Sequence, residues 1–203
     1  MRFLSLVSVF AILSFGTDFV ARAQATDNPF AGTPTRYSVD VVTTQKEGKT
    51  FTMRMYVDGD RRRTEQDTAN GRLVLILRGD LNLMYTIIVS RKAYRVRPLD
   101  PNLLKSLDAY ELAKGMLISP DKVGTETVKG QVCDKYRFSS APAKTKGSQE
   151  AESTSTGFIW ISQFTHLPVL SQTADATTEW ENLDLGPQDS SLFTAPPDFQ
   201  LID

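Results

Sequence analysis

Few side chains in this sequence have the types and spacing that catalysis requires. The 203 residues contain one histidine, His166, and one cysteine, Cys133, whereas a metal site needs several such ligands. The sequence has no Gly-x-Ser-x-Gly element for a nucleophilic serine and no phosphate-binding glycine loop. Asp108 and Glu111 share an expected helix, but carboxylates three residues apart are common on helix surfaces. We therefore expect no catalytic residues, no metal and no cofactor, and interpret the chain as a non-enzyme.

Arginine is the most concentrated polar side chain. Arg61, Arg62 and Arg63 follow the turn-like residues 58–60, and on a strand Arg61 and Arg63 point to one face and Arg62 to the other. One interpretation is a solvated strand whose charges protect a sheet edge. The other places a guanidinium at the rim of a cavity, bonded to a covering helix or to a ligand carboxylate or phosphate. Arg61 and Arg63 are the candidates for this rim or lid position.

Charge elsewhere in the chain excludes some partners. A second basic cluster, interpreted as a solvated strand and turn, comprises Arg91, Lys92, Arg95 and Arg97. Without its first 25 residues the chain would carry 21 basic and 23 acidic side chains. Such a near-neutral balance gives no general attraction to nucleic acid or to an anionic membrane.

Apolar side chains form stripes that suit either a protein core or the wall of a ligand cavity. Phe51, Met53 and Met55 alternate along one expected strand, and methionine re-packs readily around varied apolar ligands. A concave site for a hydrophobic ligand is lined mainly by such groups. The candidate ligand-binding residues are Phe51, Met53, Met55, Leu73, Leu75, Leu77, Leu103, Leu107 and Tyr110.

Alternation of polar and apolar residues predicts the strands that position these side chains. Residues 36–41 and 51–57 alternate with a period of two, and Asp58-Gly59 predicts a hairpin turn after them. Asn70-Gly71 is a second such turn. Residues 73–77 are apolar on both faces, so both faces of that strand should be covered. Six strands joined by short turns are expected before the pattern changes.

The pattern changes at Asp100-Pro101, a typical helix start with Asp as the cap. Further strands follow, two of them joined at Gly130, while residues 141–155 lack large apolar side chains and predict a loop. The apolar tail at 191–199 is expected to dock. The fold class expected is mainly β: a single curved antiparallel sheet, a half-barrel, with a short helical insertion covering its concave face. A sandwich is the competing architecture.

The N-terminus has the order of a secretory signal peptide. Arg2 precedes an apolar run at residues 3–13, and two Ala-x-Ala sites place cleavage after Ala23 or Ala25. The run is shorter than the ~20 residues of a spanning helix, so we expect no stable membrane span. The predicted organisation is a signal peptide at 1–25 and one domain at 26–203, periplasmic or secreted after cleavage.

Motifs in the second half resemble a known family. They are Gly124-x-Glu126 with Gly130, Cys133 and Tyr136; Trp160-Ile161-Ser162; Leu167-Pro168-Val169; and Asp189-x-x-Leu192-Phe193-Thr194-Ala195-Pro196-Pro197-x-Phe199. In this order and spacing the chain resembles the LolA/LolB-like superfamily of periplasmic outer-membrane lipoprotein carriers, and especially its uncharacterised relatives.

The resemblance implies an incomplete barrel that binds acyl chains without catalysis. It implies an exported soluble binder or carrier of a lipid or lipid-modified polypeptide, whose partners are a hydrophobic ligand (an acyl chain or lipoprotein) and an envelope protein. The alternative is a non-carrier envelope interaction or sensor module with the same fold. Two features depart from the carriers: residues 26–35 do not suit their N-terminal helix, and their lid-holding arginine falls somewhere among Arg61, Arg62 and Arg63.

Overall fold

The computed structural model describes residues 29–106, 122–140 and 155–202. In chain order the elements are β1 (Arg36–Gln45), β2 (Thr50–Asp58), β3 (Arg61–Thr68), β4 (Gly71–Arg78), β5 (Leu83–Ile88), η1 (Val89–Arg91), β6 (Ala93–Pro98), α1 (Pro101–Ser106), β7 (Lys122–Val128), β8 (Gln131–Ser140), β9 (Ser155–Ser162), β10 (Pro168–Thr173), β11 (Ala176–Leu185), η2 (Ser190–Phe193) and β12 (Gln200–Leu201). The predicted signal peptide and residues 141–154 of the loop predicted at 141–155 lie outside the described residues, while Ser155 is the first residue of β9. In the described part of the chain, no helix has the length and apolar character needed to cross a membrane.

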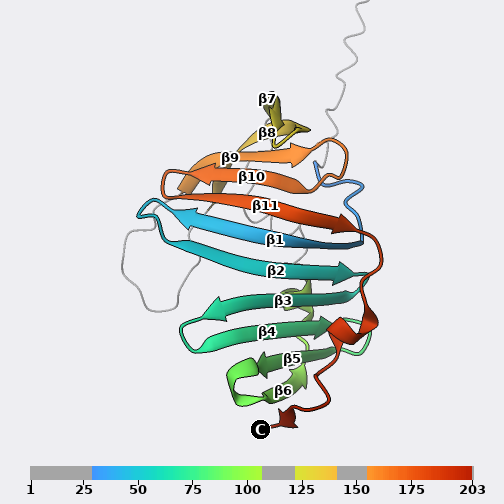
Figure 1. Ribbon diagram of the computed structural model, residues 1–203. Helices are drawn as coiled ribbons and strands as arrows, with labels where there is room; N and C mark the ends of the chain where they lie inside the picture. The colour runs from blue at the N-terminus through green and yellow to red at the C-terminus, as the bar shows by residue number, and fades with distance from the viewer. Residues whose placement is uncertain (1–28, 107–121, 141–154, 203) are drawn as a thin grey trace, which may run out of the picture.

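All twelve strands belong to one sheet, in the order β12-β6-β5-β4-β3-β2-β1-β11-β10-β9-β8-β7. The meander β1 to β6 spreads to one side of β1, and β11 back to β7 spreads to the other (Figure 1). Neighbours are antiparallel except for β12, which pairs in parallel with β6. The single sheet confirms the predicted mainly-β fold and excludes a sandwich for the described residues.

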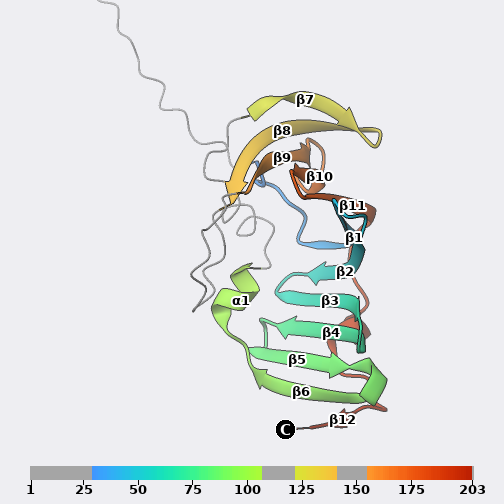
Figure 2. The ribbon, with the colours of Figure 1, turned by 90° about the vertical axis from the view of Figure 1, so that its left-hand side faces the viewer.

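The sheet curves into an open half-barrel (Figure 2). In that view β7 to β9 arch over one end, while α1 and the segment before β1 lie on the concave side. We call this concave side the inner face. We call the convex side the outer face. The C-terminal segment, residues 186–202 with η2, lies on this face, in front of β3 and β4 in Figure 1.

The β2–β3 turn lies one residue later than predicted. Its two turn residues are Gly59 and Asp60, and Gly59 has a φ of +60°, which favours glycine. Asp58 instead closes β2 as the cross-strand partner of Arg61. Its buried carboxylate accepts from Arg61 at 2.7 Å and forms an ion pair with Arg36 at 3.0 Å, and these contacts hold it in the strand.

Apolar clusters pack on both faces of the sheet. The inner clusters are Phe30 with Tyr136, Phe138, Ile159 and Ile161, and Tyr37 with Val39, Met55, Val57 and Leu167. The outer clusters are Val74, Ile76 and Ile87 with Phe193, and Cys133 with Trp160 and Val169. A strand that is apolar on both faces needs such two-sided cover, and β4 obtains its outer cover from the docked C-terminal segment, as predicted for residues 191–199.

Candidate functional site

The sheet register brings the two predicted apolar stripes onto the same face. Cross-strand partners share a face, and the row Met55–Thr64–Leu75 runs directly across β2, β3 and β4. The neighbouring rows are Met53–Gln66–Leu73 and Val57–Arg62–Leu77. Since Phe193 on the outer side packs against Val74 and Ile76, the alternate leucines of β4 lie on the inner face.

A polar strand separates the two stripes. On the inner face β3 carries Arg62, Thr64 and Gln66, between the apolar side chains of β2 and those of β4. The Arg62 guanidinium donates to the main-chain carbonyl groups of Gly59 and Arg61. The inner face therefore holds two apolar strips with a polar line between them. We call these two stripes the β2 strip (Phe51, Met53 and Met55) and the β4 strip (Leu73, Leu75 and Leu77). The alternation in residues 61–68 indicates that Arg62, Thr64 and Gln66 share a face, but only strand pairing places these side chains between the stripes.

The stripes are buried at one end and exposed at the other. Leu77 and Met55 are 1% and 8% exposed, whereas Leu73, at the start of β4, is 40% exposed. Phe51, Met53 and Leu75 are half-buried. Exposed apolar surface is therefore concentrated toward the strand ends that are remote from the β2–β3 turn. An apolar ligand would bury the most apolar surface, and so gain the most binding free energy, on this part of the inner face.

The helix α1 begins as the sequence predicts. The Asp100 carboxylate accepts from the Asn102 main-chain N–H at 2.8 Å, a side-chain cap for the first turn. The helix lies on the inner side of the curve (Figure 2), where Leu103 is half-buried. The predicted site residues Leu107 and Tyr110 lie outside the described residues.

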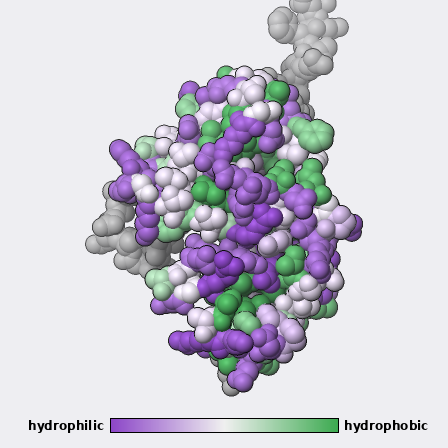
Figure 3. All heavy atoms as spheres, viewed as in Figure 1, coloured by the Kyte–Doolittle hydropathy of each residue, from purple (hydrophilic) through white to green (hydrophobic). Residues whose placement is uncertain are grey.

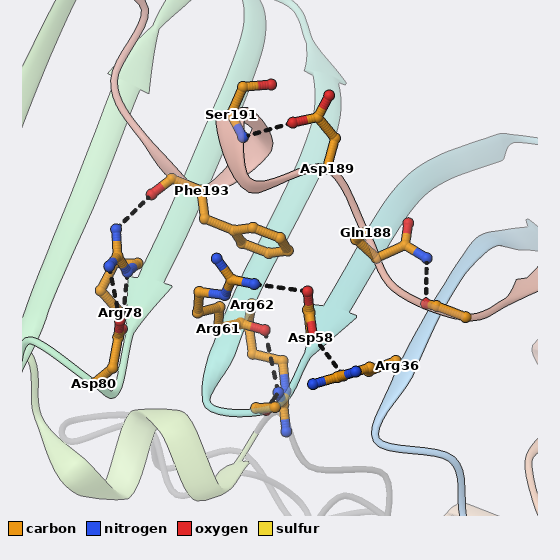
Figure 4. Close-up of polar contacts among 12 residues, drawn as sticks. Arg36, Asp58, Arg61, Arg62, Arg78, Asp80, Gln188, Asp189, Ser191 and Phe193 are labelled. Carbon is orange, nitrogen blue, oxygen red and sulfur yellow. Dashed lines mark hydrogen bonds and ion pairs between the residues drawn. The ribbon is translucent and has the colours of Figure 1, made fainter.

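Arg61 and Arg63 are the cross-strand partners of Arg78 and Ile76, so they lie on the outer face, opposite the stripes. Figure 4 shows Arg61 beside Phe193. Arg61 bonds Asp58 and stacks over the Phe193 ring at 4.8 Å. Arg63 donates to the Leu192 carbonyl oxygen at 2.8 Å and to the Glu65 carboxylate at 2.6 Å. The structure thus brings both arginines to the C-terminal segment, while Arg62 is the member of the triplet that shares a face with Met55 and Leu75.

Arg78 completes the attachment of the C-terminal segment. It donates to the Phe193 carbonyl oxygen at 3.2 Å and holds Asp80 through two hydrogen bonds of 2.8 and 2.7 Å. The hydrogen bonds from Arg78 lower the pKa of the Asp80 carboxyl, so both side chains stay charged near neutral pH. Hydrophilic side chains also run across the middle of the outer face, with apolar patches between them (Figure 3).

Cys133 and His166 lie in different surroundings. Cys133 is fully buried in an outer cluster, and burial raises the pKa of its thiol, which disfavours the reactive thiolate. His166 follows the β9 strand, where its ring lies near Gly32. Among the described residues, no three His, Cys, Asp or Glu side chains are grouped as a metal site.

These features define the class of the molecule: an open, mostly antiparallel half-barrel with two apolar strips on its inner face. Solved structures with this fold match the chain. An uncharacterized conserved protein from Thermus thermophilus is 10% identical, with a TM-score of 0.56 over 87% of this chain and 94% of that one. MucB is 15% identical, with a TM-score of 0.50 over 86% of this chain and 63% of its own.

A LolA superfamily protein from Nitrosomonas europaea matches 84% of this chain and 94% of its own, at 9% identity and a TM-score of 0.34. At these identities the likeness concerns the fold alone. No known family and no curated protein matches the sequence.

Proposed function

We propose that this chain is an exported binding protein that holds an acyl chain, from a lipid or a lipid-modified polypeptide, on the inner face of its half-barrel. The observation that carries the proposal is the pair of apolar strips, which lie on one face of the sheet on either side of β3 and which stay partly exposed. Leu73 and Leu75 represent the β4 strip, and Phe51 and Met53 represent the β2 strip. In this proposal the chain catalyses no reaction.

The geometry of the strips suits an extended hydrocarbon. Adjacent strands lie ~4.8 Å apart and same-face side chains are spaced ~7 Å along a strand. An acyl chain lying along β4 would therefore contact Leu73 and Leu75 in turn and end near the buried Leu77. Each methylene removed from water contributes ~0.8 kcal/mol, so six contacted methylenes would contribute roughly 5 kcal/mol before the cost of ordering.

The proposed release step involves α1. The helix lies on the inner side of the sheet (Figure 2), and its Leu103 and Leu104 are half-buried. Leu104 approaches Gly79 so closely that a Cβ added to that glycine would lie 2.8 Å from it. Outward movement of α1 would expose the buried end of the β4 strip at Leu77. Contact with an envelope partner is the proposed trigger, in keeping with the predicted signal peptide and export.

A second candidate, a protein-interaction module, is favoured by two other observations. Phe30 fills the inner face beneath β8 and β9, where Phe138 and Ile159 pack on it. Phe164 is 86% exposed in the β9–β10 turn, next to a Gln163 main-chain N–H that bonds the Val132 carbonyl oxygen. An exposed aromatic side chain in a turn that is hydrogen-bonded to β8 suits docking to a protein.

Titration of a fluorescent fatty acid into a Leu73→Gln/Leu75→Gln variant tests the binding proposal. Two amides on the β4 strip remove apolar contact area, so we expect the affinity to fall about tenfold, which corresponds to ~1.4 kcal/mol. Both side chains are partly exposed, and the fold should therefore survive, as checked by thermal unfolding.

The matched control is Leu81→Gln/Leu201→Gln. These leucines are 49% and 63% exposed and lie in the β4–β5 turn and in β12, away from the strips. The control should bind the probe like the parent. Equal affinity in the strip variant and the control would contradict the proposed site, and no binding by the parent would favour the interaction module.

A further inference from the structure

Strand β6, which lies next to the short edge strand β12, presents two arginines on the inner face. Arg97 pairs across β5 with Met84, and Arg95 pairs with Thr86. Those partners pair in turn with Leu77 and Leu75 of β4, the β4 strip of the proposed site. Arg95 and Arg97 are both exposed, so their guanidinium groups are open to solvent on the strip side.

The alternation along β6 fixes this orientation. Tyr94 packs with the outer cluster around Ile87 and Phe193, so residues 95 and 97 are directed to the opposite face. Since neighbouring strands lie ~4.8 Å apart, Arg95 and Arg97 sit roughly 10 Å from the β4 strip at the main-chain level. An extended arginine side chain spans much of that gap.

Charge pairing differs sharply between the two faces. On the outer face of the same half, each arginine of β2, β3 and β4 bonds a carboxylate; these pairs are Arg54–Asp40, Arg61–Asp58, Arg63–Glu65, Arg72–Asp67 and Arg78–Asp80. On the inner face, Arg62, Arg95 and Arg97 form no ion pair with any residue that the structure describes. Three uncompensated positive charges therefore border one apolar strip.

We propose that these arginines bind the anionic head group, a carboxylate or a phosphate, of the amphiphile whose acyl chain lies on the β4 strip. Arg95 and Arg97 contact the head from the β6 side, and Arg62 adds positive potential from the β3 side. The planar guanidinium forms paired hydrogen bonds with such oxyanions. This inference rests on the proposed function and narrows its ligand to an anionic amphiphile.

Calorimetric titration with three ligands that share a lauroyl chain tests the inference: laurate, lauroyl lysophosphatidylglycerol and uncharged monolaurin. The parent protein should bind one or both anionic ligands more tightly than monolaurin. In Arg95→Gln/Arg97→Gln the anionic ligand should lose at least tenfold in affinity, while monolaurin changes less than about twofold. Comparison of laurate with the phospholipid identifies the preferred head group.

The control variant is Lys46→Gln/Arg91→Gln. It removes two positive charges from exposed positions in the β1–β2 turn and in η1, so its affinities should match those of the parent. A second variant, Arg95→Lys/Arg97→Lys, keeps the charge and should keep most of the anionic preference. In the parent, 0.5 M salt should reduce anionic binding more than monolaurin binding.

The outcomes separate this inference from the proposal on which it rests. Suppose that the parent binds monolaurin, and that the parent and Arg95→Gln/Arg97→Gln bind the anionic ligands with the same affinity. This result would overturn the head-group inference and leave the acyl-chain site intact. No binding of any of the three ligands by the parent would overturn both. Equal losses of affinity for the anionic ligand in Arg95→Gln/Arg97→Gln and in Lys46→Gln/Arg91→Gln would also overturn the inference, because they would show a general effect of net charge.

Discussion

Phe193→Ala is expected to lower the free energy of unfolding by about 3–5 kcal/mol, the usual cost of truncating a fully buried phenylalanine. The Phe193 side chain is 0% exposed and packs on Val74, Ile76 and Ile87. Its ring also receives the guanidinium of Arg61. Truncation would leave a cavity between the C-terminal segment and the sheet, and the segment has no larger buried anchor among its described residues.

Urea unfolding followed by tryptophan fluorescence measures this effect. Leu201→Ala is the control, because Leu201 is 63% exposed and should change stability by less than about 0.5 kcal/mol. If Phe193→Ala unfolds at the same urea concentration as the parent, the C-terminal segment is not part of the folded core. The docking that Figure 4 shows would then contribute little to stability.

Met55→Arg should destabilise the protein by several kcal/mol and is expected to prevent folding at 37 °C. Met55 is 8% exposed and packs with Tyr37, Val39 and Val57, so the substitution would bury a charge among apolar groups. Met53→Arg, two residues earlier on the same face, is the matched variant. Met53 is half-buried, and its variant should stay folded while binding the fluorescent fatty acid more weakly.

Thermal unfolding together with probe titration distinguishes the two methionine positions. If Met55→Arg folds with the melting temperature of the parent and binds no probe, Met55 belongs to the ligand-contacting surface and not to the core. Unfolding of both variants would contradict the graded exposure along the β2 strip. The expected pattern, unfolding only at Met55, supports a strip that is core at one end and binding surface at the other.

Much of the meander could be predicted from local sequence. Period-two alternation in residues 51–57 specifies which side chains share a face, because consecutive strand residues point to opposite sides. Glycine-containing turns limit the connections between strands, and Asp100-Pro101 marks the start of α1. Local patterns define each apolar stripe along its own strand, and the register of β2, β3 and β4 brings both stripes to one face.

The remaining features depend on pairing between distant segments, which local patterns do not encode. Strand β3 looks like a solvated charged strand, yet it lies between the two apolar strips. Arg61 and Arg63 alternate with Arg62 as predicted, but what they contact is decided by the C-terminal segment, where the partner of Arg63 lies 129 residues away along the chain. The need for glycine at position 157 also depends on strand pairing, because a Cβ added there would lie 2.1 Å from the Gln172 carbonyl oxygen on the neighbouring strand.

Native mass spectrometry of the protein purified from the cell envelope tests the central claim most directly. If the inner face carries an acyl chain, part of the protein should show the mass of the chain plus one amphiphile. Organic extraction should remove this excess, and Leu73→Gln/Leu75→Gln should carry much less of it than Leu81→Gln/Leu201→Gln. A single ligand-free mass in every sample, together with no binding of the fluorescent fatty acid by the parent, would contradict the claim.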